Sequence, residues 1–263
     1  MNRIEKKFKE LKSKRKKAFI PFITAGDPNL KTTEELVLSF EGAGADIVEL
    51  GVPFSDPLAD GPTIQESSTR ALKKGVNLAK ILKTVARIRQ RSQIPIALMT
   101  YYNPVFHYGE DKFIRDAKKN GVDGVIIPDL PPEEAKGLIR SAKKRDVSVV
   151  FFLAPTTTTR RMKKIVKAST GFIYYVSITG VTGATKRFSA QNAAKIRTAK
   201  KFTKKAICVG FGIATPAQAR SVAKIADGII VGSAIIKQID KNRGKKNLVK
   251  NVSRFVRTLS RGL

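Results

Sequence analysis

The alternation of two kinds of segment is the feature of this sequence that most limits its fold. Short runs rich in β-branched and aromatic residues are separated by longer stretches with apolar residues at helical spacing, such as Leu78–Arg89 and Phe113–Asn120. There are eight such runs: Ala18–Thr24, Asp46–Gly51, Pro95–Tyr101, Gly124–Pro128, Val147–Leu153, Phe172–Ser177, Ala206–Gly210 and Gly228–Val231. Eight strand–helix units without a Pro/Gly-rich linker predict a single (β/α)8 TIM barrel over residues 1–263. A doubly wound open sheet is the alternative.

A weak internal repeat favours the barrel. The segments GADIVEL (44–50), GVDGVII (121–127) and ADGIIVG (226–232) each follow a helical stretch and place an Asp just before a strand. Gly44 and Gly121 suit the left-handed residue that ends a helix. Before the first strand, residues 1–17 have the helical spacing Ile4-Phe8-Leu11, which predicts an extra basic amphipathic helix that closes the bottom of the barrel.

Composition excludes several classes of chemistry. The single cysteine, Cys208, rules out an internal disulfide and a cysteine-cluster metal site, and its apolar strand predicts a buried side chain. The single histidine, His107, argues against a Ser-His-Asp triad and is expected at the surface or an interface. No apolar run approaches the ~20 residues of a membrane helix, and residues 1–17 lack the apolar core of a signal peptide. We therefore expect a cytoplasmic protein without membrane contact.

The net charge of +30 is unusual. Such a balance often indicates a polyanionic partner. Here the basic residues are spread along the chain in pairs such as Lys73-Lys74 and Lys200-Lys201, and no tract interleaves them with aromatic residues. Solvated helix faces are therefore favoured over a specific nucleic-acid surface, which stays open as the alternative.

The end of the second predicted strand carries the strongest signal for chemistry, because barrel enzymes place their reactive groups at the carboxyl ends of strands. Glu49 lies within the apolar run Asp46–Gly51, where a carboxylate is unfavourable unless it is paired, protonated or used in a reaction. Asp60 follows in a loop stiffened by prolines, which could hold it near Glu49. Two carboxyl groups in different environments can act as proton donor and ionised acceptor. The alternatives are a structurally satisfied Glu49 and a turn-capping Asp60.

Glycines follow the last three predicted strands, within the segments 177–183, 210–216 and 232–234. Glycine lets backbone amides approach an anion closely, and Gly232-Ser233 could open a short helix whose N-terminus faces it. The pattern predicts a phosphate site at strands six to eight.

Together these segments resemble a known family. The string ELGVPFSDPLADGP, with PFITAGDP before it and GVTG, GFGI and GSAI after it, closely resembles the alpha subunit of tryptophan synthase, over Phe19 to about Leu248. The resemblance implies retro-aldol cleavage of indole-3-glycerol phosphate to indole and glyceraldehyde 3-phosphate, a lyase reaction. Glu49 and Asp60 fall on the two catalytic carboxyls of the family. Glu49 would exchange protons with indole C3 and the glycerol hydroxyl, and Asp60 would hold the indole N–H.

The resemblance also assigns binding residues. The phosphate would be held by Gly183, Gly212, Gly232 and Ser233. Tyr174 would lie near the catalytic glutamate, and Thr182 would reach Asp60 when the sixth loop closes. The indole pocket would be lined by Phe22, Tyr101, Ile127 and Phe211, for which plain core packing is the alternative. Ile178 stands where better-known bacterial members have an arginine, so an ion pair from that position is not expected.

The family works with a beta subunit, which carries pyridoxal phosphate, so no cofactor is expected in this chain. The partner would contact the second and third loops, including Pro53, Asp56, Pro57, Pro104 and Phe106. A standalone indole-releasing lyase would keep the same catalytic residues and is the second hypothesis. A non-enzymatic barrel that binds polyanions is the third, but it would need neither the two carboxyls nor the glycine turns.

Overall fold

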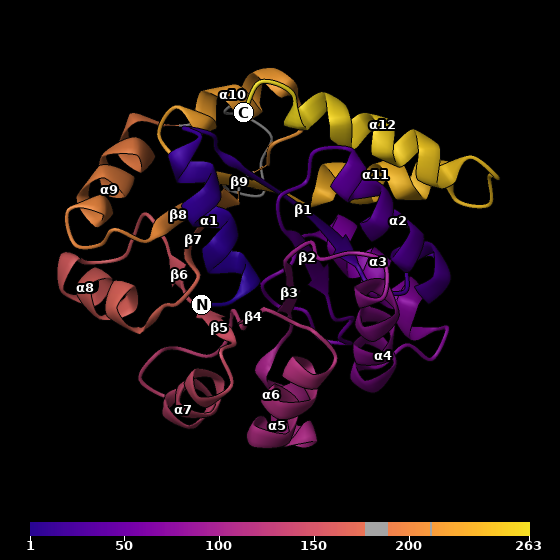
Figure 1. The fold of residues 1–263 in the computed structure, drawn as a ribbon, viewed down its shortest axis with the longest axis horizontal. Coiled ribbons are helices and arrows are strands. Elements are labelled where there is room, and N and C mark those ends of the chain that lie inside the picture. The colour runs from indigo at the N-terminus through magenta and orange to yellow at the C-terminus, as the bar shows by residue number, and fades with distance from the viewer. Residues whose placement is uncertain (177–188, 211) are drawn as a thin grey trace.

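The chain forms one parallel sheet that curves into a ring with helices around it (Figure 1). The structure is a computed structural model that describes residues 1–176, 189–210 and 212–263. Its strands are β1 (Ala18–Thr24), β2 (Val48–Gly51), β3 (Ile96–Met99), β4 (Gly124–Ile126), β5 (Ser148–Val150), β6 (Phe152–Leu153), β7 (Phe172–Val176), β8 (Ala206–Gly210) and β9 (Gly228–Val231). Every pairing between them is parallel.

The fifth predicted strand differs from expectation, because the structure divides it into β5 and β6 at Phe151. The strand order is β5-β4-β3-β2-β1-β9-β8-β7-β6, so the two halves of this interrupted strand stand at the two ends of the sheet. The Tyr174 amide donates to the Phe151 carbonyl at 3.1 Å, and the Thr170 amide donates to the Val149 carbonyl at 2.8 Å. These bonds close the ring at eight strand positions, which confirms the barrel and excludes the open sheet.

The helices bury one apolar stripe each against the strands, as expected from their helical spacing. In α4, for example, Ile81, Val85 and Ile88 are fully buried. The helices are α1 (Arg3–Ser13), α2 (Leu30–Gly42), α3 (Pro62–Leu72), α4 (Leu78–Arg89), α5 (Tyr102–Tyr108), α6 (Glu110–Lys119), α7 (Lys136–Lys144), α8 (Thr159–Ala168), α9 (Ala190–Lys200), α10 (Pro216–Ala223), α11 (Ser233–Asn242) and α12 (Leu248–Ser260). No helix in these ranges is both long and apolar enough to cross a membrane.

The repeated Asp before a strand has a structural role. Each of the three carboxylates accepts a backbone N–H at the start of a neighbouring strand, so the repeat supplies a hydrogen-bond acceptor for that amide. Gly44 and Gly121, which precede two of these aspartates, have φ of +93° and +89°, as predicted for helix ends. The pairs are Asp46 with the Phe19 amide (2.9 Å), Asp123 with Ile96 (2.9 Å) and Asp227 with Ile207 (3.0 Å).

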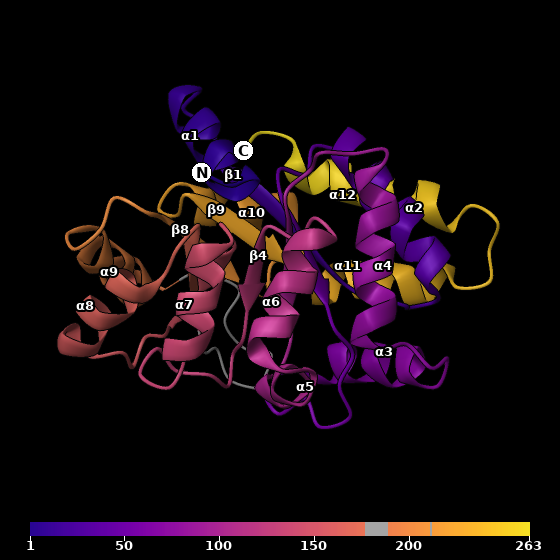
Figure 2. The ribbon, with the colours of Figure 1, turned by 60° about the horizontal axis from the view of Figure 1, so that its bottom comes forward.

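Helix α1 covers the amino-terminal end of the barrel, as predicted. Asn2 caps the helix and donates from its side chain to the Asp123 carbonyl at 3.0 Å and to the Ser148 hydroxyl at 2.7 Å. Ile4 is fully buried, and the ring of Phe8 lies 5.8 Å from that of Phe172. Figure 2 shows α1 at one end of the barrel and α3 and α5 at the other, where the carboxyl ends of the strands lie.

Candidate active site

The carboxyl ends of the strands surround a cavity of about 660 Å³. Its wall combines aromatic and aliphatic side chains with one carboxyl, several glycines and one lysine. The lining residues are Phe22, Ala59, Asp60, Gly61, Ile64, Met99, Pro128, Phe152, Tyr174, Val176, Gly210, Gly212, Ile213, Ala214, Ile230, Gly232, Ser233, Ala234 and Lys237. An apolar region with a few polar groups at defined places is typical of a small-molecule site.

Glu49 lies on β2, paired in register with Phe22 of β1 on one side and Ala97 of β3 on the other. Its side chain is 0 % exposed, and neither carboxyl oxygen has a hydrogen-bond partner among the described residues. Burial, with a smaller contribution from the nearby Asp60 charge, raises its pKa to about 8. At neutral pH this carboxyl is therefore mainly protonated and can donate a proton.

Asp60 lies in the loop between β2 and α3. The loop turns back on itself, because the Asp60 amide donates to the Pro57 carbonyl at 3.0 Å and Gln65 donates to the Asp60 carbonyl at 2.8 Å. The Tyr101 hydroxyl donates to the Asp60 carboxylate at 3.1 Å and accepts the Ala59 amide at 3.0 Å. Tyr101 therefore holds both the loop backbone and the Asp60 carboxylate.

The environment of Asp60 differs from that of Glu49. Burial raises the pKa of Asp60 to about 6, and the Tyr101 hydrogen bond opposes part of this rise by stabilising the ionised form. Asp60 is therefore mainly ionised at neutral pH while Glu49 keeps its proton. The two carboxyls therefore differ in protonation at neutral pH, which is the condition under which such a pair can act as proton donor and acceptor.

Tyr174, on β7, forms the aromatic wall of the cavity. Its ring lies 4.7 Å from that of Phe152 and 6.5 Å from that of Phe172. Gly210 on β8 permits this position, because a Cβ there would meet the Tyr174 hydroxyl at 2.5 Å. Burial first, and the Glu49 and Asp60 charges second, raise the pKa of Tyr174 well above its usual range, so its hydroxyl stays neutral.

The part of the cavity wall at the start of α11 suits an anion. Helix α11 begins at Ser233, directly after β9, with Gly232 at its N-cap position and Ser233 on the cavity wall. The first amides of a helix have no partner within it and can bind a phosphate. Lys237, one turn further along α11, lines the same cavity and adds a positive charge.

Metal chemistry has no evident site in the described ranges. No group of three or more His, Cys, Asp or Glu side chains there could hold a metal ion.

Comparison with known proteins agrees with this geometry. The family model described as tryptophan synthase alpha chain matches residues 8–263. The tryptophan synthase alpha chain of Geotalea daltonii is 49% identical over 263 residues, which cover 100% of this chain and 99% of the relative. The chain from a Thermoanaerobacter species is 48% identical over 259 residues and covers 98% of each.

Solved structures give the same result. The structure of tryptophan synthase subunit alpha from Legionella pneumophila matches with a TM-score of 0.92 and 39% identity, covering 99% of this chain and 97% of that one. A tryptophan synthase complex from Pyrococcus furiosus contains a chain that matches with a TM-score of 0.84 and 38% identity. The match covers 92% of this chain and 97% of that one. The chain belongs to the tryptophan synthase alpha chain family.

The structure brings together most of the residues expected from the resemblance to tryptophan synthase alpha. On the cavity wall lie Phe22, Asp60, Tyr174, Gly212, Gly232 and Ser233. Tyr101 contacts Asp60 from behind the wall. Ile127 is buried but is not part of the lining, which agrees with the core-packing alternative. Thr182, Gly183, Phe211 and Ile178 lie outside the described residues.

Lys237 and Phe152 are among the residues of the cavity wall that sequence reasoning did not name. Lys237 lies four positions after Ser233, so helical spacing from the predicted N-terminus could have placed it near the same cavity. Phe152 has an ordinary apolar strand pattern, and only the closure of the ring brings it onto Tyr174. Outside the site, Cys208 is buried as predicted and His107 is exposed as predicted.

Proposed function

We propose that this chain cleaves indole-3-glycerol phosphate to indole and glyceraldehyde 3-phosphate, with Glu49 and Asp60 as its catalytic residues. The observation that carries the assignment is a pair of carboxyls with separated pKa values, about 8 for Glu49 and about 6 for Asp60. Asp60 is half-buried and lines the cavity, whereas Glu49 is fully buried and lies outside the lining. Cleavage needs a proton donor and a stabilising anion at the same time, and neutral pH supplies both here.

The reaction begins at the indole ring. Protonated Glu49 donates its proton to ring carbon C3, which places positive charge on the ring nitrogen. Ionised Asp60 accepts a hydrogen bond from the indole N–H and stabilises that charge. Tyr101 keeps Asp60 in position through its 3.1 Å hydrogen bond.

The carbon–carbon bond then breaks. Glu49, now ionised, removes the proton of the glycerol hydroxyl beside the bond, and a carbonyl forms there. The electron pair of the broken bond returns to the ring and neutralises the nitrogen, which gives indole. Glu49 ends the cycle protonated, so no proton is gained or lost overall.

The substrate would span the cavity from its aromatic wall to α11. Phe22, Tyr174 and Phe152 would contact the indole ring, with Tyr101 behind Asp60. The amides at Gly212, Gly232 and Ser233, together with the Lys237 ammonium, would bind the phosphate. Gly183, Phe211 and Thr182 would complete the phosphate site, the indole pocket and the loop contact to Asp60, as the resemblance implies.

Exposed apolar side chains at the loop face favour the alpha-half hypothesis over a standalone lyase. Leu58 and Phe106, in the second and third loops, are 85% and 67% exposed, which is unusual for such apolar side chains. Asp56 is exposed and Pro57 and Pro104 are half-buried beside them, whereas Pro53 is buried and would support the loop from below. These loops would bind the beta subunit, and pyridoxal phosphate would belong to that partner. The cytoplasmic location expected from the sequence stays a prediction.

The direct test is indole release from indole-3-glycerol phosphate by the purified chain. We expect E49Q and D60N to lower turnover by at least ~10²-fold, the usual scale for removing a positioned acid–base group. Asp56→Asn, which neutralises an exposed carboxylate in the same loop, is the matched control and should keep turnover within about twofold. Turnover near that of the parent protein in E49Q would overturn the assignment.

A further inference from the structure

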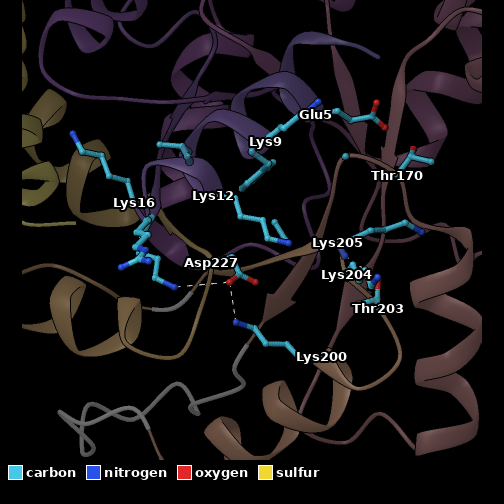
Figure 3. A pocket seen from close by; sticks show the side chains of 16 residues that line it. Glu5, Lys9, Lys12, Lys16, Thr170, Lys200, Thr203, Lys204, Lys205 and Asp227 are labelled. Carbon is cyan, nitrogen blue, oxygen red and sulfur yellow. Dashed lines mark hydrogen bonds and ion pairs between the residues drawn. The ribbon is translucent and has the colours of Figure 1, made fainter.

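A second cavity lies at the opposite end of the barrel from the candidate active site. It has a volume of about 680 Å³ and lies between α1 and the segments that lead into β7, β8 and β9 (Figure 3). We call it the basic groove. It is lined by Glu5, Phe8, Lys9, Leu11, Lys12, Arg15, Lys16, Lys17, Thr170, Gly171, Lys200, Thr203, Lys204, Lys205, Ala206 and Asp227.

Three of the eight cations in the basic groove have structural partners. Asp227 pairs with Lys200 at 2.8 Å, as a dashed line in Figure 3 shows, and with Lys17 at 3.9 Å. Lys205 donates to the Val166 carbonyl at 2.7 Å. These contacts hold the loops in place and explain why those three lysines are present.

The other five cations make no ion pair and no side-chain hydrogen bond within the described parts of the chain. Four of them follow one another along and just beyond α1, and the fifth stands across the groove before β8, so segments about 190 residues apart in sequence meet here. Figure 3 shows Lys9 and Lys12 on one side of the groove and Lys204 on the other. The five are Lys9, Lys12, Arg15, Lys16 and Lys204.

Local neutralisation occurs elsewhere on α1 but not in the groove. Glu10 pairs with Lys7 at 3.0 Å and with Lys14 at 2.7 Å, whereas Glu5 is the only groove acid besides Asp227. Unpaired like charges repel one another, and a bound anion with several charges removes that repulsion. Solvated helix faces explain scattered lysines, but they do not explain a concave surface that gathers five of them.

The lining also has an apolar part. Phe8 is partly buried on Phe172, and Leu11 and Ala206 lie beside it in the same cavity. The volume falls in the range of roughly 300–1,000 Å³ that is usual for pockets that hold small organic ligands. A single inorganic phosphate would fill only part of this space and reach only some of the cations.

We propose that the basic groove binds a small organic polyphosphate with an apolar, ring-bearing part, of the nucleoside triphosphate class. Lys9, Lys12 and Lys204 contact the phosphates, and the ring lies against Phe8 and Leu11. The groove lies at the amino-terminal end of the barrel, away from the loops proposed to bind the beta subunit, so it stays accessible in the complex.

The test measures binding of adenosine triphosphate to the full chain by calorimetry at physiological ionic strength, where the Debye length is about 8 Å and diffuse attraction is largely screened. We expect a Kd below about 1 mM. The groove variant K9A/K12A/K204A should weaken binding by at least roughly tenfold, equivalent to about 1.4 kcal/mol. The control variant K31A/K83A/K250A removes the same charge from exposed lysines of α2, α4 and α12 and should change Kd by less than about twofold.

Two further probes define the ligand. Tripolyphosphate should bind at least roughly tenfold more weakly than adenosine triphosphate, because it lacks a ring to cover the apolar lining. Equal loss of adenosine triphosphate binding in both triple variants would mean that net charge alone drives binding, and it would overturn the proposal. Equal affinities for adenosine triphosphate and tripolyphosphate would overturn it as well. The parent protein could instead bind a single-stranded oligonucleotide but not adenosine triphosphate, and the groove variant could lose that binding. This result would assign the groove to nucleic acid and would also overturn the proposal.

Discussion

Replacing Glu49 with Gln should stabilise the folded protein in neutral and alkaline solution, although it removes the proposed catalytic acid. The carboxyl has an ordinary pKa of 4.5 and reaches about 8 in the folded chain, chiefly because it is fully buried. A group with a raised folded-state pKa contributes stability in full below its unfolded pKa and loses that contribution as pH rises through its folded pKa. Glutamine has a similar shape and does not ionise, so the variant escapes this loss.

The magnitude follows from the shift. A rise from 4.5 to about 8 is about 3.5 pKa units, and each unit corresponds to about 1.4 kcal/mol. The free energy of unfolding of E49Q relative to the parent protein should therefore increase by about 5 kcal/mol between pH 4 and pH 9, with about two-thirds of the change complete at pH 7. Asp60 titrates in both proteins, so its contribution largely cancels in the difference.

The assay is urea unfolding of both proteins at pH 4, 7 and 9. Glu35→Gln is the matched control, because Glu35 is exposed and has no ion pair among the described residues, so its stability difference should stay within about 0.5 kcal/mol at every pH. A difference between E49Q and the parent protein that does not change with pH would refute the reasoning, since it would mean that Glu49 has an ordinary pKa in the folded state.

Three other predictions concern the phosphate end and the partner. Lys237→Ala should raise KM for indole-3-glycerol phosphate by roughly tenfold and keep kcat within about threefold, because it removes one charge-assisted contact to phosphate. Lys83→Ala is the control, and an unchanged KM in Lys237→Ala would contradict the contact. Gly212→Leu should abolish the rise in Tm that glycerol phosphate causes. Gly244→Leu, which shares a positive φ and open space at Cβ, should keep that rise, and retained protection in Gly212→Leu would place the anion elsewhere. Phe106→Asp should leave indole release by the isolated chain within about twofold but prevent its stimulation by a beta subunit. The control Phe202→Asp should keep that stimulation. Stimulation that persists in Phe106→Asp would exclude the third loop from the interface.

The fold was largely predictable because its signals are local. The strands Ala18–Thr24, Ala206–Gly210 and Gly228–Val231 have the predicted bounds, since each is a continuous apolar run between turn residues. The interruption at Phe151 was not predictable, because its cause lies in pairing with two different neighbours rather than in the run itself.

Part of the cavity wall could be predicted from the sequence, but the size of the pKa difference between Glu49 and Asp60 could not. Glu49 attracts notice because a charged residue interrupts an apolar strand, and the glycines mark turns. The separation of the two pKa values depends on full burial of one carboxyl and on the Tyr101 hydrogen bond to the other. Tyr101 and Asp60 are 41 positions apart, so only the folded ring brings them together.

The central claim is that a protonated Glu49 and an ionised Asp60 act together, and the pH dependence of kcat/KM for indole release tests it most directly. Activity should fall below about pH 6 as Asp60 gains a proton and above about pH 8 as Glu49 loses its own, which gives a bell-shaped profile whose limbs belong to the coupled pair. In D60N the residual activity should lack the acid limb and keep the alkaline one. A profile that stays flat from pH 5 to pH 9, or an acid limb that persists in D60N, would contradict the account.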